Sequence, residues 1–113
     1  MHNIILYCKS YAGDVQRVKK LKGSIEKYNK DNIPFYISCP KKDKQLFEDT
    51  LGKENHILIL DEDIVTLKYL ELDGWRSQQI VKSSLHKLKI TKNYVCLDSD
   101  AYFITDFYKS DFL

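Results

Sequence analysis

The sequence predicts a single α/β domain in three layers, with a mainly parallel sheet and helices on both of its faces. Short apolar runs alternate along the chain with longer segments of helical periodicity. Such alternation favours parallel strands joined by right-handed helical crossovers. A length of 113 residues leaves room for one domain, spanning residues 1–113, with one hydrophobic core.

The first half of the chain supplies three of the expected strands and two helices. The apolar run at residues 3–8 (NIILYC) is continuous, which predicts a strand buried on both faces. A helix is expected over residues 15–29, where apolar side chains recur at steps of three or four, with Asp14 as its cap. A second strand over 33–39 ends at Pro40, a short helix over 42–51 ends at Gly52, and a buried third strand covers 56–61.

The second half begins with an acidic connection, residues 61–74, whose pattern assigns no element. A helix is expected over residues 75–90, because Val81, Leu85 and Leu88 fall on one face. Residues 91–93 are expected to turn the chain into a buried fourth strand over residues 94–98 (YVCLD). Strands and helices are therefore expected to alternate along the chain, with no repeats or linkers.

Composition and charge favour a soluble globular protein. Hydrophobic residues make up 43% of the chain and charged residues 30%. A formal charge of +2 does not predict a nucleic-acid partner, which usually demands a larger basic excess. Two short lysine clusters, at residues 19–22 and 41–44, are interpreted as solvated faces, with an anionic ligand or a membrane surface as the alternative.

The cysteines and the amino-terminal residues indicate a cytoplasmic location. Cys8, Cys39 and Cys96 are an odd set without CxxC spacing, which favours reduced, buried thiols over disulfides or a zinc site. The opening MHNIILYCKS lacks the basic start and long apolar stretch of a signal peptide. No apolar run reaches the length of a membrane span, so no transmembrane segment is expected.

Two carboxylates, Asp98 and Asp100, follow the fourth strand at the position where open parallel sheets collect ligands. In an extended segment, side chains at i and i+2 face the same side, so both carboxylates are expected to converge. Two like charges at short range repel unless a cation offsets them. Mg²⁺ and Mn²⁺ accept one or two carboxylates together with substrate phosphates. The pattern predicts such a metal site; the alternative is an exposed Asp-Ser-Asp turn.

A second polar segment, GWRSQQIVKSSL at residues 74–85, opens the expected helix. Its plain interpretation is a core tryptophan followed by ordinary surface residues. Together with YVCLDSDAYFI, however, it resembles the region around the DxD motif of GT-A fold glycosyltransferases. It is most similar to bacterial glycosyltransferase-like proteins that carry GW-x-x-QQ-x-x-K before a strand ending in D-[SA]-D. SYAGDV and IPFYISCPKKD match the opening of that group, so the resemblance covers nearly the whole chain.

The resemblance implies a Rossmann-like GT-A fold, specifically the half that binds a nucleotide-diphosphate sugar. Asp98 and Asp100 match the DxD motif and would hold Mn²⁺ or Mg²⁺ and the donor diphosphate. In such enzymes the later aspartate, here Asp100, is usually the direct metal ligand, and the earlier one meets the ribose or sugar. Ser10 and Tyr11 match the segment that meets the base and ribose.

Four further residues are assigned from the same resemblance. Asp61, at the end of the third strand, is expected to contact the base. The other three are expected near the phosphates or sugar of the donor: Arg76, Gln79 and Lys82. The implied activity is hexosyl transfer in surface polysaccharide synthesis, with a saccharide or lipid-linked acceptor. The expected location is the cytoplasm, either free or at the periphery of a membrane.

One departure from the family pattern concerns the end of the chain. Enzymes of this fold continue after the DxD strand into an acceptor-binding half, whereas only YFITDFYKSDFL follows Asp100 here. Asp106 and Asp111 are the carboxylates of that segment. We therefore expect a chain truncated after the DxD strand, part of a longer protein, that transfers sugar poorly or not at all by itself.

Two other readings stay open. The chain could be a non-catalytic nucleotide-binding or structural remnant of the same fold. Haloacid-dehalogenase-like phosphatases also place Asp-x-Asp after a strand, normally the first one, and continue with Thr or Val where this chain has Tyr102.

Overall fold

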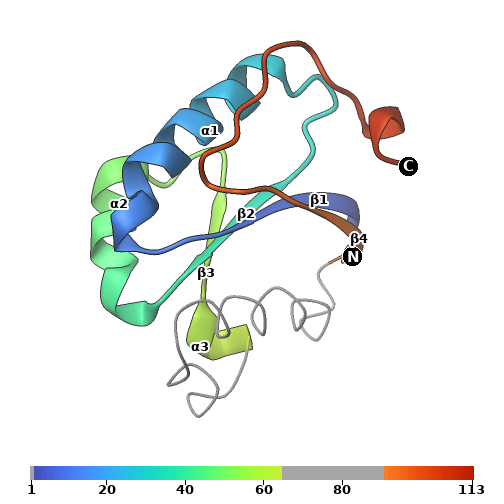
Figure 1. Ribbon diagram of the computed structural model, residues 1–113. Coiled ribbons are helices and arrows are strands. Elements are labelled where there is room, and N and C mark those ends of the chain that lie inside the picture. Colours follow the sequence, from blue (N-terminus) through green and yellow to red (C-terminus); the bar gives the residue numbers. More distant parts are fainter. Residues whose placement is uncertain (1, 65–90) are drawn as a thin grey trace.

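The computed structural model describes residues 2–64 and 91–113, and in this part of the chain it shows a four-stranded parallel sheet with helices packed on it (Figure 1). The strands are β1 (His2–Lys9), β2 (Phe35–Cys39), β3 (Ile57–Leu60) and β4 (Thr91–Cys96). The helices are α1 (Val15–Tyr28), α2 (Lys44–Leu51) and α3 (Asp61–Ile64), with 3-10 turns at Ala12–Asp14, Lys41–Asp43 and Lys109–Asp111. The expected α/β, Rossmann-like fold class is confirmed.

The strand order is β3-β2-β1-β4, and each neighbouring pair is parallel. The chain first builds outward from β1 through β2 to β3, and β4 then pairs on the other side of β1. Tyr7 in β1 lies opposite Tyr36 in β2 and Cys96 in β4. The sheet order therefore reverses between β1 and β4, which is the position where open α/β sheets form a ligand crevice.

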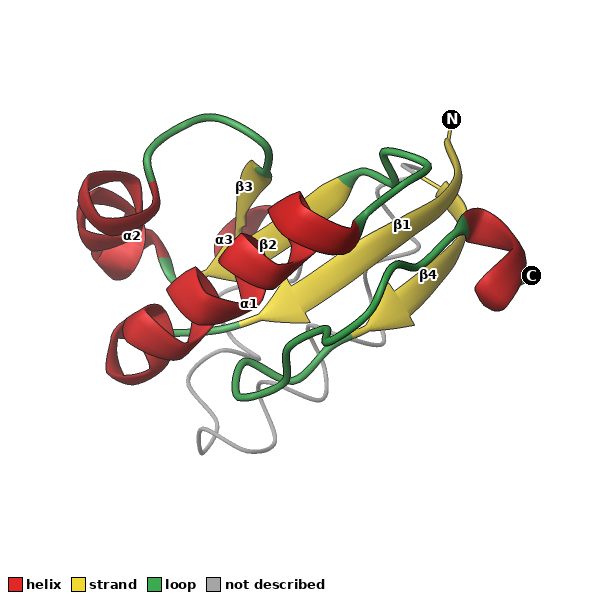
Figure 2. Ribbon diagram, turned by 90° about the horizontal axis from the view of Figure 1, so that it is seen from above, coloured by secondary structure: helices red, strands yellow, loops and turns green. Residues whose placement is uncertain are grey.

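One face of the sheet carries the hydrophobic core. Figure 2, seen from above, shows α1 lying across this face. Side chains at alternate positions of β1 and β2 point to this face and meet the apolar stripe of α1. Phe47 of α2 is fully buried in the same cluster. The buried members of this core from the sheet and α1 are Ile4, Leu6, Cys8, Phe35, Ile37, Cys39, Val15, Val18, Leu21 and Ile25.

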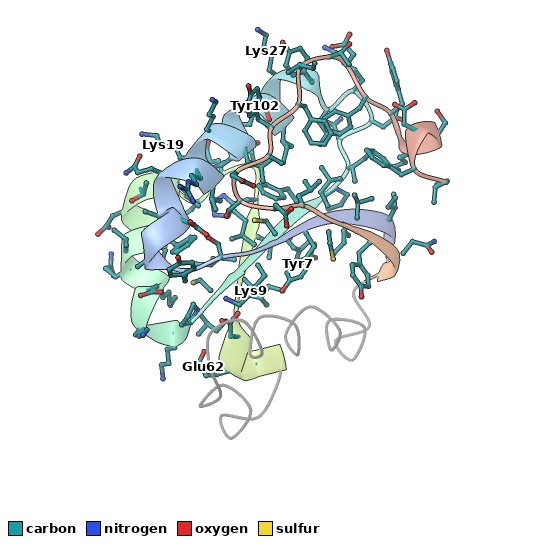
Figure 3. All side chains as sticks on the ribbon, viewed as in Figure 1. Tyr7, Lys9, Lys19, Lys27, Glu62 and Tyr102 are labelled. Atoms are coloured by element: carbon teal, nitrogen blue, oxygen red, sulfur yellow. The ribbon has the colours of Figure 1, made fainter. Side chains whose placement is uncertain are left out.

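The opposite face of the sheet is also buried but more polar. The alternate positions of β1 place Tyr7 and Lys9 there, and Ser38 of β2 joins them; all three side chains are buried. Figure 3 shows Tyr7, Lys9 and Glu62 on the side of the sheet away from α1. Helix α3 begins on this side, because Asp61 contacts Lys9 directly.

The segment after β4 returns over the core face and lies alongside α1 (Figures 1 and 2). We call residues 101–113 the tail. The backbone N–H of Phe103 donates to Ser24 Oγ at 2.9 Å, and the N–H of Phe107 donates to the carbonyl of Tyr28 at 3.0 Å. Phe107 is buried and stacks on Phe103 with ring centroids 3.9 Å apart. The tail is thus part of the packed domain.

Several boundaries and burial predictions are wrong. The third strand was expected to be buried, but β3 is outermost in the described sheet and Ile57 is 47% exposed. The turn expected at residues 91–93 is already strand, because Thr91 pairs with His2 and Asn93 with Ile4. β4 is only partly buried, and Cys96 is exposed rather than buried. Pairing on a single side leaves an outer strand open to solvent.

Other local predictions are confirmed. Gly52 ends α2 with a positive φ of 73°, and its N–H donates to the carbonyl of Glu48 at 3.0 Å. The helices in the described part of the chain are all too short or too polar to be membrane spans.

Candidate functional site

The carboxyl ends of β1 and β4 meet at one edge of the sheet and carry half of the predicted donor-site residues. Beyond the last strand pair, the N–H of Leu97 donates to the carbonyl of Tyr7 at 2.7 Å, so the two chains stay together up to the edge. From there β1 leads into Ser10 and Tyr11, and β4 leads into Asp98 and Asp100. We call this edge the β1–β4 edge.

The Asp-Ser-Asp segment forms a tight turn instead of continuing as extended chain. The N–H of Ala101 donates to the carbonyl of Asp98 at 3.0 Å, which closes an i to i+3 turn. The expected extended backbone is therefore wrong, and the segment adopts the alternative of an exposed Asp-Ser-Asp turn. The side chains of Asp98 and Asp100 are both exposed at the β1–β4 edge. Their role as metal ligands stays a prediction.

Ser99 fixes this turn to the start of α1. Its Oγ donates to Asp14 Oδ2 at 2.9 Å, across 85 positions of sequence. The other oxygen of Asp14 accepts a hydrogen bond from Arg17 at 3.1 Å. Asp14 occupies the N-cap position of α1 but makes no side-chain cap hydrogen bond, so the predicted capping role is wrong. Its carboxylate serves as the anchor of the Asp-Ser-Asp turn, a role that local sequence could not reveal.

Ser10 and Tyr11 lie at the β1–β4 edge in different ways. Ser10 is fully buried, and its N–H donates to the carbonyl of Ser38 at 2.9 Å. Tyr11 is 43% exposed, so its ring is the accessible member of the pair. A Cβ atom at Gly13 would lie 2.7 Å from Tyr11 Cε2. Glycine at position 13 therefore leaves the space that the ring occupies.

Asp43 holds the loop that carries Tyr11, and sequence analysis did not single it out. Its buried carboxylate accepts a hydrogen bond from the N–H of Ala12 at 3.0 Å. Asp43 lies in the turn before α2, directly after the end of β2. The carboxyl ends of β1 and β2 are thereby joined, which stiffens the β1–α1 loop.

Asp61 is buried against Lys9 on the polar face of the sheet. Lys9 Nζ lies 2.9 Å from Asp61 Oδ2 and donates to the carbonyl of Ser10 at 2.6 Å. Burial raises the pKa of Asp61 above its usual value, and the positive charge of Lys9 offsets part of this effect. Within the described chain, Asp61 Oδ1 is buried without a hydrogen-bond partner. The nearby Ser38 hydroxyl also lowers the pKa of Asp61. Its hydrogen bond is with the Tyr7 hydroxyl, at 2.5 Å.

Asp61 therefore does not lie on the surface as a ready contact for a base. A buried carboxylate with one unpaired oxygen would accept a hydrogen bond only from a group that reaches the same enclosed position. Lys9 is the partner that sequence analysis missed, because an apolar run followed by one lysine does not indicate a buried ion pair.

Three of the predicted donor-site residues lie outside the described part of the chain, together with the whole GWRSQQIVKSSL segment. They are Arg76, Gln79 and Lys82.

Asp98 and Asp100 suit a divalent cation only together with further oxygen ligands. In residues 2–64 and 91–113, no three His, Cys, Asp or Glu side chains form a group that could hold a metal ion. Two exposed carboxylates are nevertheless the protein ligands that Mg²⁺ typically uses when phosphate and water complete its coordination. These two residues fit a metal that arrives with a diphosphate and do not form an all-protein metal cage. The two carboxylates of the tail have partners away from this edge. Asp106 lies 3.6 Å from Lys30, and Asp111 accepts a hydrogen bond from the N–H of Tyr108.

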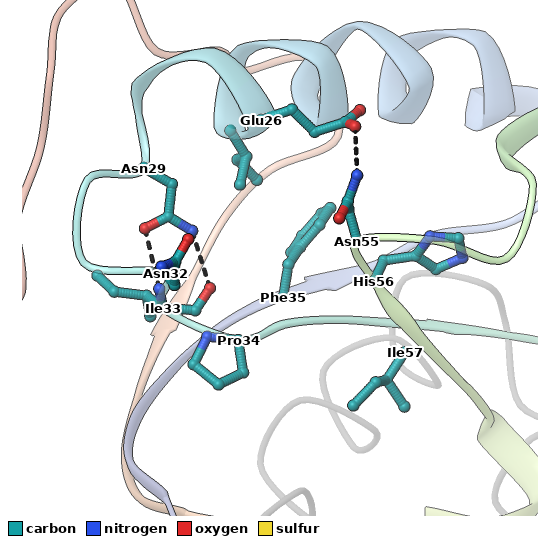
Figure 4. A pocket seen from close by; sticks show the side chains of 10 residues that line it. Glu26, Asn29, Asn32, Ile33, Pro34, Phe35, Asn55, His56 and Ile57 are labelled. Atoms are coloured by element: carbon teal, nitrogen blue, oxygen red, sulfur yellow. Dashed lines mark hydrogen bonds between the residues drawn. The ribbon is translucent and has the colours of Figure 1, made fainter.

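A separate cavity of about 410 Å³ lies at the amino ends of β2 and β3, away from the β1–β4 edge (Figure 4). Asn55 Nδ2 donates to Glu26 Oε2 at 2.7 Å on one side, and Asn29 exchanges two 2.9 Å hydrogen bonds with the backbone of Ile33 on another. None of the candidate site residues predicted from the sequence lines this cavity. Because parallel sheets bind ligands at their carboxyl ends, the β1–β4 edge remains the candidate site.

Residues 3–113 match a protein family described as a family of unknown function (DUF6492). The chain belongs to this family. No curated protein and no solved structure matches the chain. Membership of DUF6492 covers both the sheet and the tail, so the β1–β4 edge described above belongs to the family's matched region.

Proposed function

We propose that this DUF6492 chain is the donor-binding half of a GT-A glycosyltransferase of hexosyl type. In this proposal the β1–β4 edge binds a nucleotide-diphosphate sugar together with Mn²⁺ or Mg²⁺. Asp98 and Asp100 hold the metal, with Asp100 as the direct ligand and Asp98 also near the ribose or sugar. The proposed context is surface polysaccharide synthesis in the cytoplasm, with a saccharide or lipid-linked acceptor.

The observation that supports this proposal most is the reversal of strand order between β1 and β4. It brings two segments 87 positions apart, Tyr11 and Asp98, to the same edge of a parallel sheet. The Ser99–Asp14 hydrogen bond then ties the acidic turn to the loop that carries Tyr11. A ring and two carboxylates at one edge suit a nucleotide, the ring for its base and the carboxylates, through a divalent cation, for its diphosphate.

Each residue at the edge has a defined task in the proposed site. Tyr11 presents an exposed ring surface on which a base can stack, and Gly13 leaves room for it. Ser10 and Asp43 position the loop through buried hydrogen bonds. Asp61 is buried beside Lys9, so it would contact the base only through Oδ1, which has no hydrogen-bond partner among the described residues. Arg76, Gln79 and Lys82 meet the phosphates or sugar.

The bound metal would act as a Lewis acid and stabilise the charge of the departing nucleoside diphosphate. The protein contributes exposed carboxylates on a turn that is anchored at Ser99, so the ligands need little reorganisation. Loss of one such electrostatic stabiliser typically lowers the rate about 100- to 1000-fold.

Fluorescence of Trp75, the single tryptophan of the chain, tests the proposal directly. UDP and GDP are titrated with and without MnCl₂. We expect a manganese-dependent change in the wild type, and Asp100→Asn should weaken binding about tenfold or more, because a charge-assisted ligand is lost. Asp106→Asn is the matched control, since Asp106 is an exposed carboxylate paired with Lys30.

The proposal fails if neither nucleotide changes the fluorescence or the thermal stability of the chain in the presence of manganese. It also fails if Asp100→Asn and Asp106→Asn bind nucleotide equally well.

A second candidate is nucleotide binding without catalysis by this chain. The supporting observation is that the tail uses its polar side chains for packing: Asp106 pairs with Lys30, and Asp111 with the N–H of Tyr108. Within the described residues, the tail therefore brings no carboxylate to the β1–β4 edge that could serve as a general base. Binding of nucleotide with no turnover, in the presence of simple saccharide acceptors, would favour this candidate.

A further inference from the structure

We infer that the outer surface of α1 and the adjoining tail form a docking face for an anionic phospholipid membrane. The face consists of Lys19, Lys20, Lys27, Tyr102 and Ile104, and we call it the α1–tail face. It is separate from the β1–β4 edge, and binding there requires neither a metal nor a nucleotide.

The lysines are placed by the periodicity of α1. The helix buries Val15, Val18 and Ile25 against the sheet, so the positions on its opposite side face outward. Lys20 and Lys27 are seven residues apart and therefore lie on one line along that outer side. Lys19 lies at its margin, and all three lysines are exposed. Figure 3 shows Lys19 and Lys27 pointing away from the sheet.

The tail runs beside this line of lysines and is fixed at two points. Phe103 is bound through its N–H to Ser24 Oγ at 2.9 Å, and Asp106 lies 3.6 Å from Lys30. Ile104 therefore falls between these two anchors. Nearer the start of α1, Lys20 Nζ lies 4.2 Å from the centre of the Tyr102 ring.

The positive charges of this face are not neutralised locally. Of the neighbouring cations, Arg17 pairs with Asp14 and Lys30 with Asp106. The nearest other carboxylate on α1, Glu26, is hydrogen-bonded to Asn55 on the flank away from the tail. Among the residues that the structure describes, none of the three lysines of the α1–tail face forms an ion pair with a carboxylate.

The apolar side chains of the face distinguish a membrane from other anionic partners. Ile104 is 77% exposed and Tyr102 is about half exposed, although the neighbouring Phe103 and Phe107 hold the tail in the core. An exposed isoleucine held by a fixed backbone can enter the boundary between headgroups and acyl chains. Lysines beside it would meet the phosphates of anionic lipids. A polynucleotide would use the lysines but leave Ile104 in water.

Flotation of the 113-residue chain with vesicles tests this inference. We expect binding to vesicles of phosphatidylcholine mixed with phosphatidylserine, weaker binding at high salt, and little binding to phosphatidylcholine alone. The triple change Lys19→Gln, Lys20→Gln and Lys27→Gln should weaken binding roughly 100-fold, from about fivefold for each lysine. Ile104→Ser should also weaken binding but leave its salt dependence unchanged.

The matched control is a triple change at three exposed lysines elsewhere: Lys41→Gln, Lys42→Gln and Lys53→Gln. It alters net charge by the same amount and should keep most of the binding, with circular dichroism confirming the fold of every variant. Equal losses in the two triple variants would overturn the inference, because net charge alone would then explain binding. Absence of binding to anionic vesicles, or binding to an RNA oligonucleotide in their place, would overturn it as well.

Discussion

Lys9 and Asp61 illustrate how a buried charge pair constrains this chain at the scale of single residues. Both side chains are almost completely buried, and their contact is 2.9 Å. Burial of one charge without the other is far less favourable than burial of both. The pair joins the end of β1 to the end of β3 across β2, and so fixes the geometry of the sheet edge that leads into Ser10 and Tyr11.

Replacement of one partner should therefore be much more damaging than replacement of both. We expect Lys9→Met to destabilise the chain by roughly 3–5 kcal/mol, since it leaves Asp61 charged and unpaired or forces it to take up a proton. The double variant Lys9→Met, Asp61→Leu should recover most of this loss. Urea unfolding followed by circular dichroism measures both values, and equal losses in the single and double variants would contradict the assignment.

The raised pKa of Asp61 predicts a pH dependence of stability with a definite sign. Above the usual carboxyl value of 3.8, the unfolded chain has released a proton that the folded chain still holds at Asp61. The folded state thus binds more protons, and its stability falls as pH rises through this window. In Asp61→Asn this contribution is absent, so the decline with rising pH should be smaller than in the wild type. A steeper decline in Asp61→Asn would show that the pKa of Asp61 is lowered instead.

Tyr11 and Gly13 give a residue-scale test of the proposed nucleotide site that leaves Asp98 and Asp100 intact. Gly13→Ala places a methyl group where the Tyr11 ring lies, and the exposed ring can move outward. We expect little change in unfolding free energy but about fivefold weaker nucleotide binding, because stacking on one base contributes roughly 1–3 kcal/mol. Tyr11→Phe is the control and should retain binding. Unchanged affinity in Gly13→Ala and in Tyr11→Ala would remove Tyr11 from the site.

At the scale of elements, the tail packs against α1 and the core face of the sheet. Phe107 is 4% exposed and contacts two other rings, stacking on Phe103 and meeting Phe112 edge-on. Its backbone also bridges to the chain beyond α1, through the N–H of Lys30. The end of the chain thus contributes a substantial share of the packing on α1.

Truncation of this ring should have a large effect on stability. We expect Phe107→Ala to lower the free energy of unfolding by roughly 3–5 kcal/mol, as for other buried phenylalanines. Ile104→Ala, three residues earlier and exposed, should change it by less than about 0.5 kcal/mol. Thermal or urea unfolding distinguishes the two, and similar values for both variants would show that the tail does not pack as described.

The strands and helices themselves could be predicted well from the sequence, but the order in which the strands pair could not. The continuous run from Ile4 to Cys8 identifies a buried strand, and the spacing of Val15, Val18 and Ile25 identifies α1. These signals are local. The exposure of Ile57 depends on β3 being outermost in the sheet, and strand order is set by long-range pairing that no local pattern contains.

The candidate site shows the same division. The positions of Asp98 and Asp100 just after a strand were predictable, because the apolar run YVCL gives way there to charged and polar residues. The turn at Asp98 was the alternative that the sequence offered, because Asp-Ser-Asp is favourable turn chemistry. The bond from Ser99 to Asp14 could not be predicted, since a contact over 85 positions leaves no periodic trace. The same holds for Lys9 and Asp61.

At the scale of the whole molecule, the described chain combines the β1–β4 edge with a tail that folds back over the carboxyl-terminal half of α1. We expect the isolated 113 residues to bind a nucleoside diphosphate but to transfer sugar poorly or not at all, because no described carboxylate of the tail reaches the β1–β4 edge. Release of nucleoside diphosphate from radiolabelled nucleotide sugars, with and without saccharide acceptors, measures this. Robust transfer by the 113-residue chain would contradict it.

We propose that a divalent cation joins the carboxylates of Asp98 and Asp100 to a nucleotide diphosphate. Crystals of the chain soaked with manganese and UDP test it most directly, through anomalous scattering collected at the manganese edge. We predict a manganese peak within coordination distance of Asp100 and bridged to the diphosphate, with the base beside Tyr11. UDP bound elsewhere, or at the β1–β4 edge with neither aspartate in contact with manganese, would rule out this metal site.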